Sequence, residues 1–157
     1  MTSNEIHFFR NRVLLDDFRA SVIPRLLRTR ANRQGIKIWC IDGSTGQEPY
    51  SLAICLKEMG ASLSGIHIEI LATDLSHEAI EKSKAGRYSQ FEVQRGLPIA
   101  MLVKYFTRVG DSWQVNPDIH TMVRHQQLNL LNDFSPLGTF DVIFCRDSLT
   151  YFDVSAR

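Results

Sequence analysis

The sequence predicts an α/β fold of the doubly wound kind, and three observations support this prediction. An apolar run at residues 36–41, rich in β-branched and aromatic side chains, reads as a buried strand and leads into small residues and a helix start. Further strands are expected at residues 66–73, 121–127 and 140–145, and they alternate with helical patterns. Asp74 directly follows the second run, at the strand end where ligands bind in open α/β sheets.

The first strand leads into a turn, residues 42–46, and Pro49 then opens a helix at a place where its missing N–H costs nothing. Strand, glycine-containing turn and helix N-terminus together form the usual cradle for a nucleotide-like ligand. Gly43 and Gly46 allow the backbone to approach a ligand closely, and Gln47 and Glu48 stand at the mouth to hydrogen-bond it. The turn contains neither G-x-G-x-x-G, G-K-[ST] nor G-x-S-x-G, so it carries no dinucleotide, phosphate-loop or hydrolase motif. A plain structural turn and a ligand loop both stay open on motif logic alone.

Asp74 has two interpretations. A carboxylate at the end of the second strand accepts both hydroxyl hydrogens of a ribose in many sheets of this kind. Alternatively, Asp74 caps the next helix, although Ser76 already makes a good N-cap for a helix over residues 77–85. We therefore expect Asp74 to bind a ribose.

The other segments predict a chain of helices around this centre. Helical spacing of apolar residues predicts an amphipathic helix from about residue 16 to residue 30, which Pro24 should kink or divide. The helix after the turn should stop at Gly60. An irregular stretch is expected from Arg87, followed by a short helix near residues 97–105.

Composition indicates a single ordinary globular unit. The 157 residues suffice for one domain with a core, with 44% hydrophobic and 22% charged residues and no repeat or linker. A net charge of +1 gives no electrostatic case for nucleic acid or an anionic membrane. Cys40, Cys55 and Cys145 all lie in apolar stretches, which favours a reduced, cytoplasmic protein with buried thiols. The scattered histidines predict no metal site, and no signal peptide or membrane-spanning run is expected.

Five ordered stretches resemble one family. The run at residues 44–51 (STGQEPYS), preceded by Trp39, resembles the signature of the chemotaxis receptor (CheR-type) methyltransferases. Four further stretches match the same family in the same order: residues 8–10 (FFR), 72–74 (ATD), 129–131 (NLL), and 140–146 (FDVIFCR) with 151–153 (YFD). Such enzymes use S-adenosylmethionine (S-adenosylhomocysteine being the product) to methyl-esterify glutamates on chemoreceptors. The resemblance therefore implies a partial doubly wound, Rossmann-like class I methyltransferase sheet, with strand order 3-2-1-4 for the strands named above.

The resemblance also implies the site residues. Arg146 and Tyr151 would line the methyl-transfer pocket, and Arg10 would help to hold a substrate or cofactor carboxylate. Several segments would contribute the residues that contact the cofactor, which are Asn4, Arg10, Gly43, Gly46, Glu48, Asp74, Asn129, Leu130, Arg146 and Asp147. Without the resemblance, the arginines read as surface cations, Tyr151 as an amphipathic core residue and Asn129 as a turn residue.

Three departures from the family pattern bear on activity. Ile6 stands where the family usually has a threonine, which removes a hydroxyl near the cofactor. Asp42 brings a negative charge into a turn that is neutral in the family, and we expect this charge to weaken cofactor binding. Asp147 replaces an asparagine beside the methyl-acceptor site and would repel a glutamate substrate. Two functions follow: a methyltransferase acting on a chemoreceptor-like protein, or a catalytically weakened relative that serves as a cofactor-binding or protein-interaction module.

The family normally carries a basic helical receptor-docking domain before residue 8 and further strands after residue 153, and both are expected to lie outside this single methyltransferase-like domain, residues 1–157. With order 3-2-1-4, residues 140–145 would form an apolar sheet edge without a lysine, proline or bulge to protect it. Such an edge pairs readily with another chain. We therefore expect a homo-oligomer formed through this edge.

Overall fold

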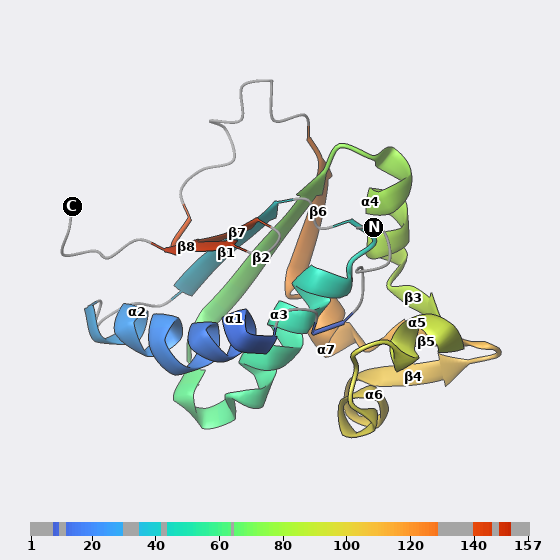
Figure 1. Cartoon of the computed structure of the whole chain (residues 1–157), viewed down its shortest axis with the longest axis horizontal. Helices are drawn as coiled ribbons and strands as arrows, with labels where there is room; N and C mark the ends of the chain where they lie inside the picture. Colours follow the sequence, from blue (N-terminus) through green and yellow to red (C-terminus); the bar gives the residue numbers. More distant parts are fainter. Residues whose placement is uncertain are drawn as a thin grey trace.

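The described residues fold into two β-sheets with helices packed against them (Figure 1). The structure is a computed structural model, and it describes residues 8–9, 12–29, 35–41, 44–63, 65–128, 140–145 and 148–151. In this part of the chain the larger sheet has five strands in the order β6-β2-β1-β7-β8. Its strands are β1 (Gly35–Ile41), β2 (His67–Asp74), β6 (Val123–Gln127), β7 (Val142–Cys145) and β8 (Ser148–Tyr151). The first four are parallel, and β8 runs antiparallel to β7.

The parallel sheet with helices confirms the predicted α/β class. The sheet contains the four predicted strands as β6, β2, β1 and β7, and it adds β8, which the sequence prediction lacked. The prediction that residues 140–145 form an unpaired edge is therefore wrong, because the chain turns back after Cys145 and pairs Val142 with Tyr151. The expected homo-oligomer rested on that edge and stays an untested prediction.

Strand β1 is the centre of the sheet because its side chains are apolar on both faces. Ile38 pairs with Ile70 of β2 on one side and with Val142 of β7 on the other. Ile38 is fully buried on the face that meets the helices, and Trp39 is buried on the opposite face. A strand buried on both faces needs a near-continuous apolar sequence, which is what residues 36–41 supply.

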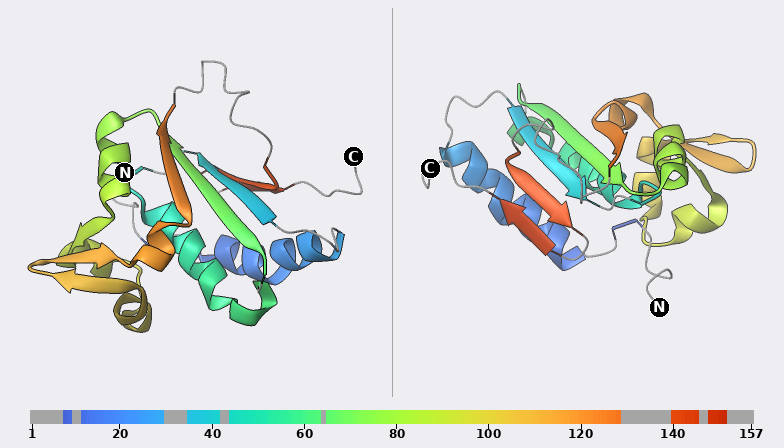
Figure 2. Two further views of the ribbon diagram at one scale, coloured as in Figure 1. Left: turned by 180° about the vertical axis from the view of Figure 1, so that it is seen from behind. Right: turned by 90° about the horizontal axis from the view of Figure 1, so that it is seen from above.

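Helices cover one face of the sheet. Figure 2 shows α1, α2 and α3 together behind the strands when the molecule is seen from above. The helices around the large sheet are α1 (Arg12–Asp17), the π-helix η2 (Phe18–Val22), α2 (Ile23–Thr29), α3 (Gln47–Glu58), the 3₁₀ helix η3 (Gly60–Leu63), α4 (His77–Ala85) and α7 (Pro117–His120). Phe18 packs edge-on against Phe144 of β7 with ring centroids 5.1 Å apart, which fixes η2 on the sheet.

The segment predicted as one helix over residues 16–30 begins earlier, at Arg12, and changes character in the middle rather than breaking. Residues 18–22 form a π-helix, and the N–H of Ile23 bonds to the carbonyl of Phe18. Pro24 follows as the second residue of α2. Because proline has no N–H and crowds the preceding turn, the wider π turn before it accommodates the ring without a break.

The opposite face of the sheet carries a smaller apolar cluster of Trp39, Leu71 and Phe140. The Trp39 ring lies 5.5 Å from the Phe140 ring. Its Nε1–H donates to Thr73 Oγ1 at 2.9 Å, inside the fold. This bond joins β1 to β2 near their carboxyl ends, where the candidate site lies.

The second sheet is small and antiparallel, in the order β3-β5-β4. Its elements are β3 (Arg87–Ser89), α5 (Gln90–Gln94), α6 (Ile99–Tyr105), β4 (Phe106–Val109) and β5 (Ser112–Val115). The expectation of an irregular stretch from Arg87 is wrong, because β3 and α5 begin there. A capping box explains the start of α5: Ser89 Oγ accepts from the Glu92 N–H at 3.1 Å, and Glu92 Oε1 accepts from the Ser89 N–H at 2.8 Å.

No helix within the described ranges is both long and apolar enough to cross a bilayer. Among the same residues, no group of three or more His, Cys, Asp or Glu side chains could hold a metal ion.

Candidate functional site

The candidate site lies at the carboxyl ends of β1 and β2, where a turn leads into α3. Ser44 and Gly46 have positive φ angles of 55° and 107°. Gly46 occupies the N-cap position of α3 without a side-chain cap, and its carbonyl accepts from the Tyr50 N–H at 3.1 Å. The turn must therefore be held in shape by residues from elsewhere in the chain.

Asp74 braces this turn from the end of β2. Parallel pairing of Ile41 with Thr73 brings the ends of β1 and β2 together. Asp74 Oδ2 accepts from the Ser44 N–H, and Oδ1 accepts from the Ser76 N–H, both at 2.9 Å. Each carboxylate oxygen has a second lone pair with which to accept a ligand hydroxyl.

The alternative role for Asp74, capping the next helix, belongs to Ser76. Ser76 Oγ accepts from the Ala79 N–H at 3.1 Å and caps α4, whose bounds match the predicted residues 77–85. Asp74 instead links the turn to the start of α4. Its carboxylate is consequently held at the ligand edge of the sheet with a fixed orientation.

Packing within the protein is sufficient reason for a glycine at residue 46. A Cβ atom at this position would overlap Tyr88 Oη and would lie 2.6 Å from Ser83 Oγ and 3.1 Å from the Tyr50 ring. The φ of 107° independently disfavours any other residue. The protein's own packing under the turn thus accounts for this glycine, and cofactor contact by its backbone stays a prediction.

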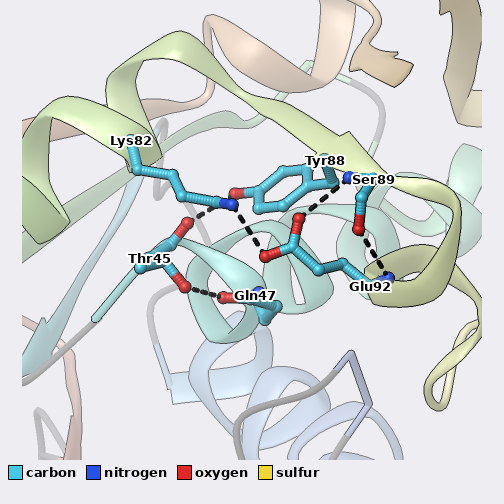
Figure 3. Close-up of polar contacts among 6 residues, drawn as sticks. All are labelled: Thr45, Gln47, Lys82, Tyr88, Ser89 and Glu92. Atoms are coloured by element: carbon cyan, nitrogen blue, oxygen red, sulfur yellow. Dashed lines mark hydrogen bonds and ion pairs between the residues drawn. The ribbon is translucent and has the colours of Figure 1, made fainter. Parts of the chain in front are cut away.

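Tyr88 lies under the turn and belongs to the small sheet. Its Oη–H donates to the Thr45 carbonyl at 2.7 Å, a contact shown in Figure 3. Thr45 Oγ1 donates to Gln47 Oε1 at 2.6 Å, so the same residue is also tied to the first turn of α3. Burial raises the pKa of Tyr88 well above its ordinary value, and its hydroxyl remains a donor.

Next to Tyr88, a polar cluster inside the fold connects α3, α4 and β6. Tyr50 Oη–H donates to the Ser83 carbonyl at 2.6 Å, and His125 Nε2 lies 2.7 Å from Ser83 Oγ. Burial, together with the neighbouring His120 and Lys84, lowers the pKa of His125 to about 4. His125 is therefore neutral near pH 7 and serves the packing of the fold.

The phenylalanine pair near the N-terminus packs against both the site helix and the small sheet. Phe8 is fully buried, with its ring 5.2 Å from Tyr88 and 5.6 Å from Phe106. The Phe9 N–H donates to Ser51 Oγ at 2.9 Å, and Ser51 Oγ–H donates to the Gln47 carbonyl at 2.6 Å. These contacts place residues 8–9 beside the start of α3.

Glu48 is half-buried in the first turn of α3, where a negative charge is favourable for the helix. Its Oε1 accepts from Cys40 Sγ at 3.8 Å, so the side chain reaches back toward β1. The structure thus brings Gly46, Glu48 and Asp74 together around one turn. The remaining predicted site residues lie outside the described residues or have undescribed side chains, and they are Asn4, Arg10, Gly43, Asn129, Leu130, Arg146, Asp147 and Tyr151.

Sequence reasoning missed Tyr88, Thr45 and Ser83. Tyr88 lies 43 residues from Thr45 in sequence, in a stretch predicted to be irregular. The available signal was Gly46 itself, because a glycine at a helix N-cap indicates either a left-handed turn or close packing.

Comparison with known proteins decides the family. Residues 4–157 match the family described as "CheR methyltransferase, SAM binding domain". The chain belongs to the CheR methyltransferase family.

Curated members of the CheR family match the whole chain. "Chemotaxis protein methyltransferase 1" of Pseudomonas aeruginosa is 36% identical over 161 residues, covering 100% of this chain and 58% of its own length. "Chemotaxis protein methyltransferase 2" of Vibrio cholerae is 38% identical, covering 100% of this chain and 55% of its own length. "Chemotaxis protein methyltransferase" of Borreliella burgdorferi is 32% identical, again over 100% of this chain and 57% of its own length. The chain therefore spans less than three fifths of each of these relatives.

The part matched is the domain that binds S-adenosylmethionine, and the described geometry fits that cofactor. The Asp74 carboxylate stands at the ligand edge, braced by the Ser44 and Ser76 N–H groups, with acceptor capacity left for ribose hydroxyls. The turn beside it presents backbone groups at the start of α3.

Proposed function

We propose that the chain binds S-adenosylmethionine at the carboxyl edge of β1 and β2 and methylates glutamate side chains of a chemoreceptor-like protein. The observation that carries the proposal is the braced carboxylate of Asp74 beside the turn into α3. Membership of the CheR family and the chemotaxis names of the relatives support the substrate class. The predicted cytoplasmic location agrees with this function.

The proposed roles follow the order of the sheet. Asp74 accepts the ribose hydroxyls, with Gly43, Gly46 and Glu48 around the aminoacyl end of the cofactor. Family resemblance assigns the adenine end to Asn129 and Leu130. It assigns the methyl-transfer pocket to Arg146 and Tyr151, and a substrate or cofactor carboxylate to Arg10. Further cofactor contacts are assigned to Asn4 and Asp147.

The chemistry asks little of side chains as acids or bases. S-adenosylmethionine supplies an electrophilic methyl group. A glutamate carboxylate is already ionised at neutral pH and needs no general base. The protein therefore contributes mainly by desolvating and aligning the two partners, and a precisely held turn matters more than a reactive group.

Calorimetric titration with S-adenosylhomocysteine tests the cofactor part. Asp74→Ala should weaken binding by about 2–3 kcal/mol, because charge-assisted hydrogen bonds contribute about that much. Since Asp74 also holds two backbone N–H groups, this variant should lose folding stability as well. Ser76→Ala is the matched control, because it removes a cap bond from the same loop and leaves the carboxylate. Equal affinities for the two variants would remove Asp74 from the site.

Transfer of a labelled methyl group to receptor fragments tests the reaction. Incorporation that is lost in Asp74→Ala supports the methyltransferase. Cofactor binding without any transfer would contradict catalysis by this chain and favour a binding module. Asp42→Gly should tighten the cofactor if the charge in the turn weakens binding, as the sequence predicts. A loss of affinity in that variant would instead make Asp42 a partner of the cofactor amino group.

A further inference from the structure

Tyr88 connects the small sheet to the turn that the proposed function assigns to the cofactor. It belongs to β3, and its ring is 1% exposed. Its hydroxyl donates at 2.7 Å to the carbonyl of Thr45, one residue from the Ser44 N–H that Asp74 holds. The turn is thus fixed from the large sheet through its N–H and from the small sheet through its C=O.

The fit between Tyr88 and the turn is close. A Cβ atom at Gly46 would overlap Tyr88 Oη, which shows that the hydroxyl lies directly against the backbone of the turn. Only a glycine at residue 46 lets the hydroxyl reach the Thr45 carbonyl. The turn and the tyrosine therefore form one packed unit, although they come from different sheets.

The position of the Tyr88 ring is itself fixed. Phe8 and Tyr50 pack edge-on against it, with centroid distances of 5.2 and 6.4 Å. Lys82 Nζ lies 5.5 Å from its centroid and pairs with Glu92 Oε2 at 2.7 Å (Figure 3). Burial alone would raise the pKa of Glu92, but the hydrogen bonds from Lys82 and Ser89 outweigh this effect, so the pKa lies below its ordinary value. The Lys82–Glu92 ion pair therefore links α4 to α5 beside the ring of Tyr88.

We propose that Tyr88 is a positioning residue of the cofactor site: its hydroxyl, held by the small sheet, sets the orientation of the 44–46 turn. This inference rests on the proposed function, since it takes the turn to be the one that binds S-adenosylmethionine. Tyr88 touches no reacting atom. Its effect is on how well the turn is arranged before the cofactor arrives.

Tyr50 provides a matched control. It is as buried as Tyr88, and its hydroxyl also donates to a backbone carbonyl, at 2.6 Å. That carbonyl belongs to Ser83 in α4 and not to the turn. Tyr88→Phe and Tyr50→Phe each remove one oxygen and keep the ring, so a purely structural effect should be similar in both.

The experiment measures thermal unfolding and titration with S-adenosylhomocysteine for the wild-type chain and both variants. Both variants should lower Tm. Tyr88→Phe alone should weaken S-adenosylhomocysteine binding, by about five- to tenfold, as expected for one lost hydrogen bond that orders the turn. Wild-type affinity in Tyr88→Phe, or equal weakening in both variants, would overturn the inference. A wild-type chain that binds no S-adenosylhomocysteine would instead refute the proposed function, and the inference with it.

A second pair of variants decides the case if Tyr88→Phe does not fold. Glu92→Gln removes the Lys82–Glu92 ion pair beside the Tyr88 ring and should weaken S-adenosylhomocysteine binding about twofold or more. Glu58→Gln removes a pair of the same kind, Glu58 with Lys104 at 2.7 Å, near the far end of α3. That control should bind as the wild type does. Equal affinities for the two glutamine variants would overturn the inference.

Discussion

Gly46→Ala should be among the most destabilising single substitutions in the chain. The added Cβ would overlap Tyr88 Oη and lie 2.6 Å from Ser83 Oγ, well inside van der Waals contact. Backbone strain at φ 107° costs about 1–2 kcal/mol for a residue other than glycine. Overpacking adds about 1–3 kcal/mol, and loss of the Tyr88–Thr45 bond adds about 1 kcal/mol. The expected loss in the free energy of unfolding is therefore about 3–6 kcal/mol.

Urea unfolding followed by far-ultraviolet circular dichroism measures this loss, with Gly60→Ala as control. Gly60 also has a positive φ, of 54°, but nothing lies within 4 Å of its added Cβ. Its substitution should cost only about 1 kcal/mol, the strain being partly offset in the unfolded chain. The double variant Gly46→Ala, Tyr88→Phe should be no less stable than Gly46→Ala, because the overlap with the hydroxyl disappears. Equal losses at Gly46 and Gly60, or additive losses in the double variant, would refute this account.

Three further predictions concern buried groups. The folded chain keeps His125 neutral, so stability should fall by about 1–2 kcal/mol more in the wild type than in His125→Gln as the pH drops from about 6.5 toward 4, measured by urea unfolding at each pH. Trp39→Phe should lose about 2 kcal/mol in the same assay, because the buried Thr73 hydroxyl loses its donor, whereas Trp113→Phe, with an exposed bond, should lose less than half of that. Burial raises the pKa of Cys55 to about 11, so mass spectrometry should show alkylation at pH 8 at least about tenfold slower in the folded chain than in urea. Equal losses of stability in the wild type and His125→Gln would contradict the first prediction, and equal losses in the two tryptophan variants would contradict the second. Equal alkylation rates in the folded and the urea-unfolded chain would contradict the third.

Much of the fold could be predicted because its signals are local. The apolar run of β1, and Ser76 before α4, carry their structural meaning within a few residues. The start of α5 also has a local cue, the S-x-x-E pattern of Ser89 and Glu92, which the expectation of an irregular stretch overlooked. Strand β3 has no such cue, because it pairs with β5, more than 20 residues further along the chain. Strand β8 was missed because the expected sheet edge assumed that the chain would not turn back after Cys145.

The site divides in the same way. The position of Asp74 at the end of β2, beside the turn, could be predicted, and Ser76 takes the cap role as expected; the ribose contact of Asp74 stays a prediction. Gly46 was predicted from the close approach of a ligand, which stays a prediction, whereas the structure shows a packing reason for this glycine. Its conformation follows from a partner, Tyr88, whose position depends on a second sheet that no local pattern in the turn indicates.

The two long-range hydrogen bonds that hold the turn both go to its backbone and not to its side chains. Asp74 accepts the Ser44 N–H, and Tyr88 donates to the Thr45 C=O. The shape of the turn is therefore set by residues 30 and 43 positions away from the groups that they hold, and the Thr45–Gln47 bond adds a local contact. A reaction that proceeds by alignment suits this arrangement, because the turn is held before any ligand arrives and little ordering entropy remains to oppose binding.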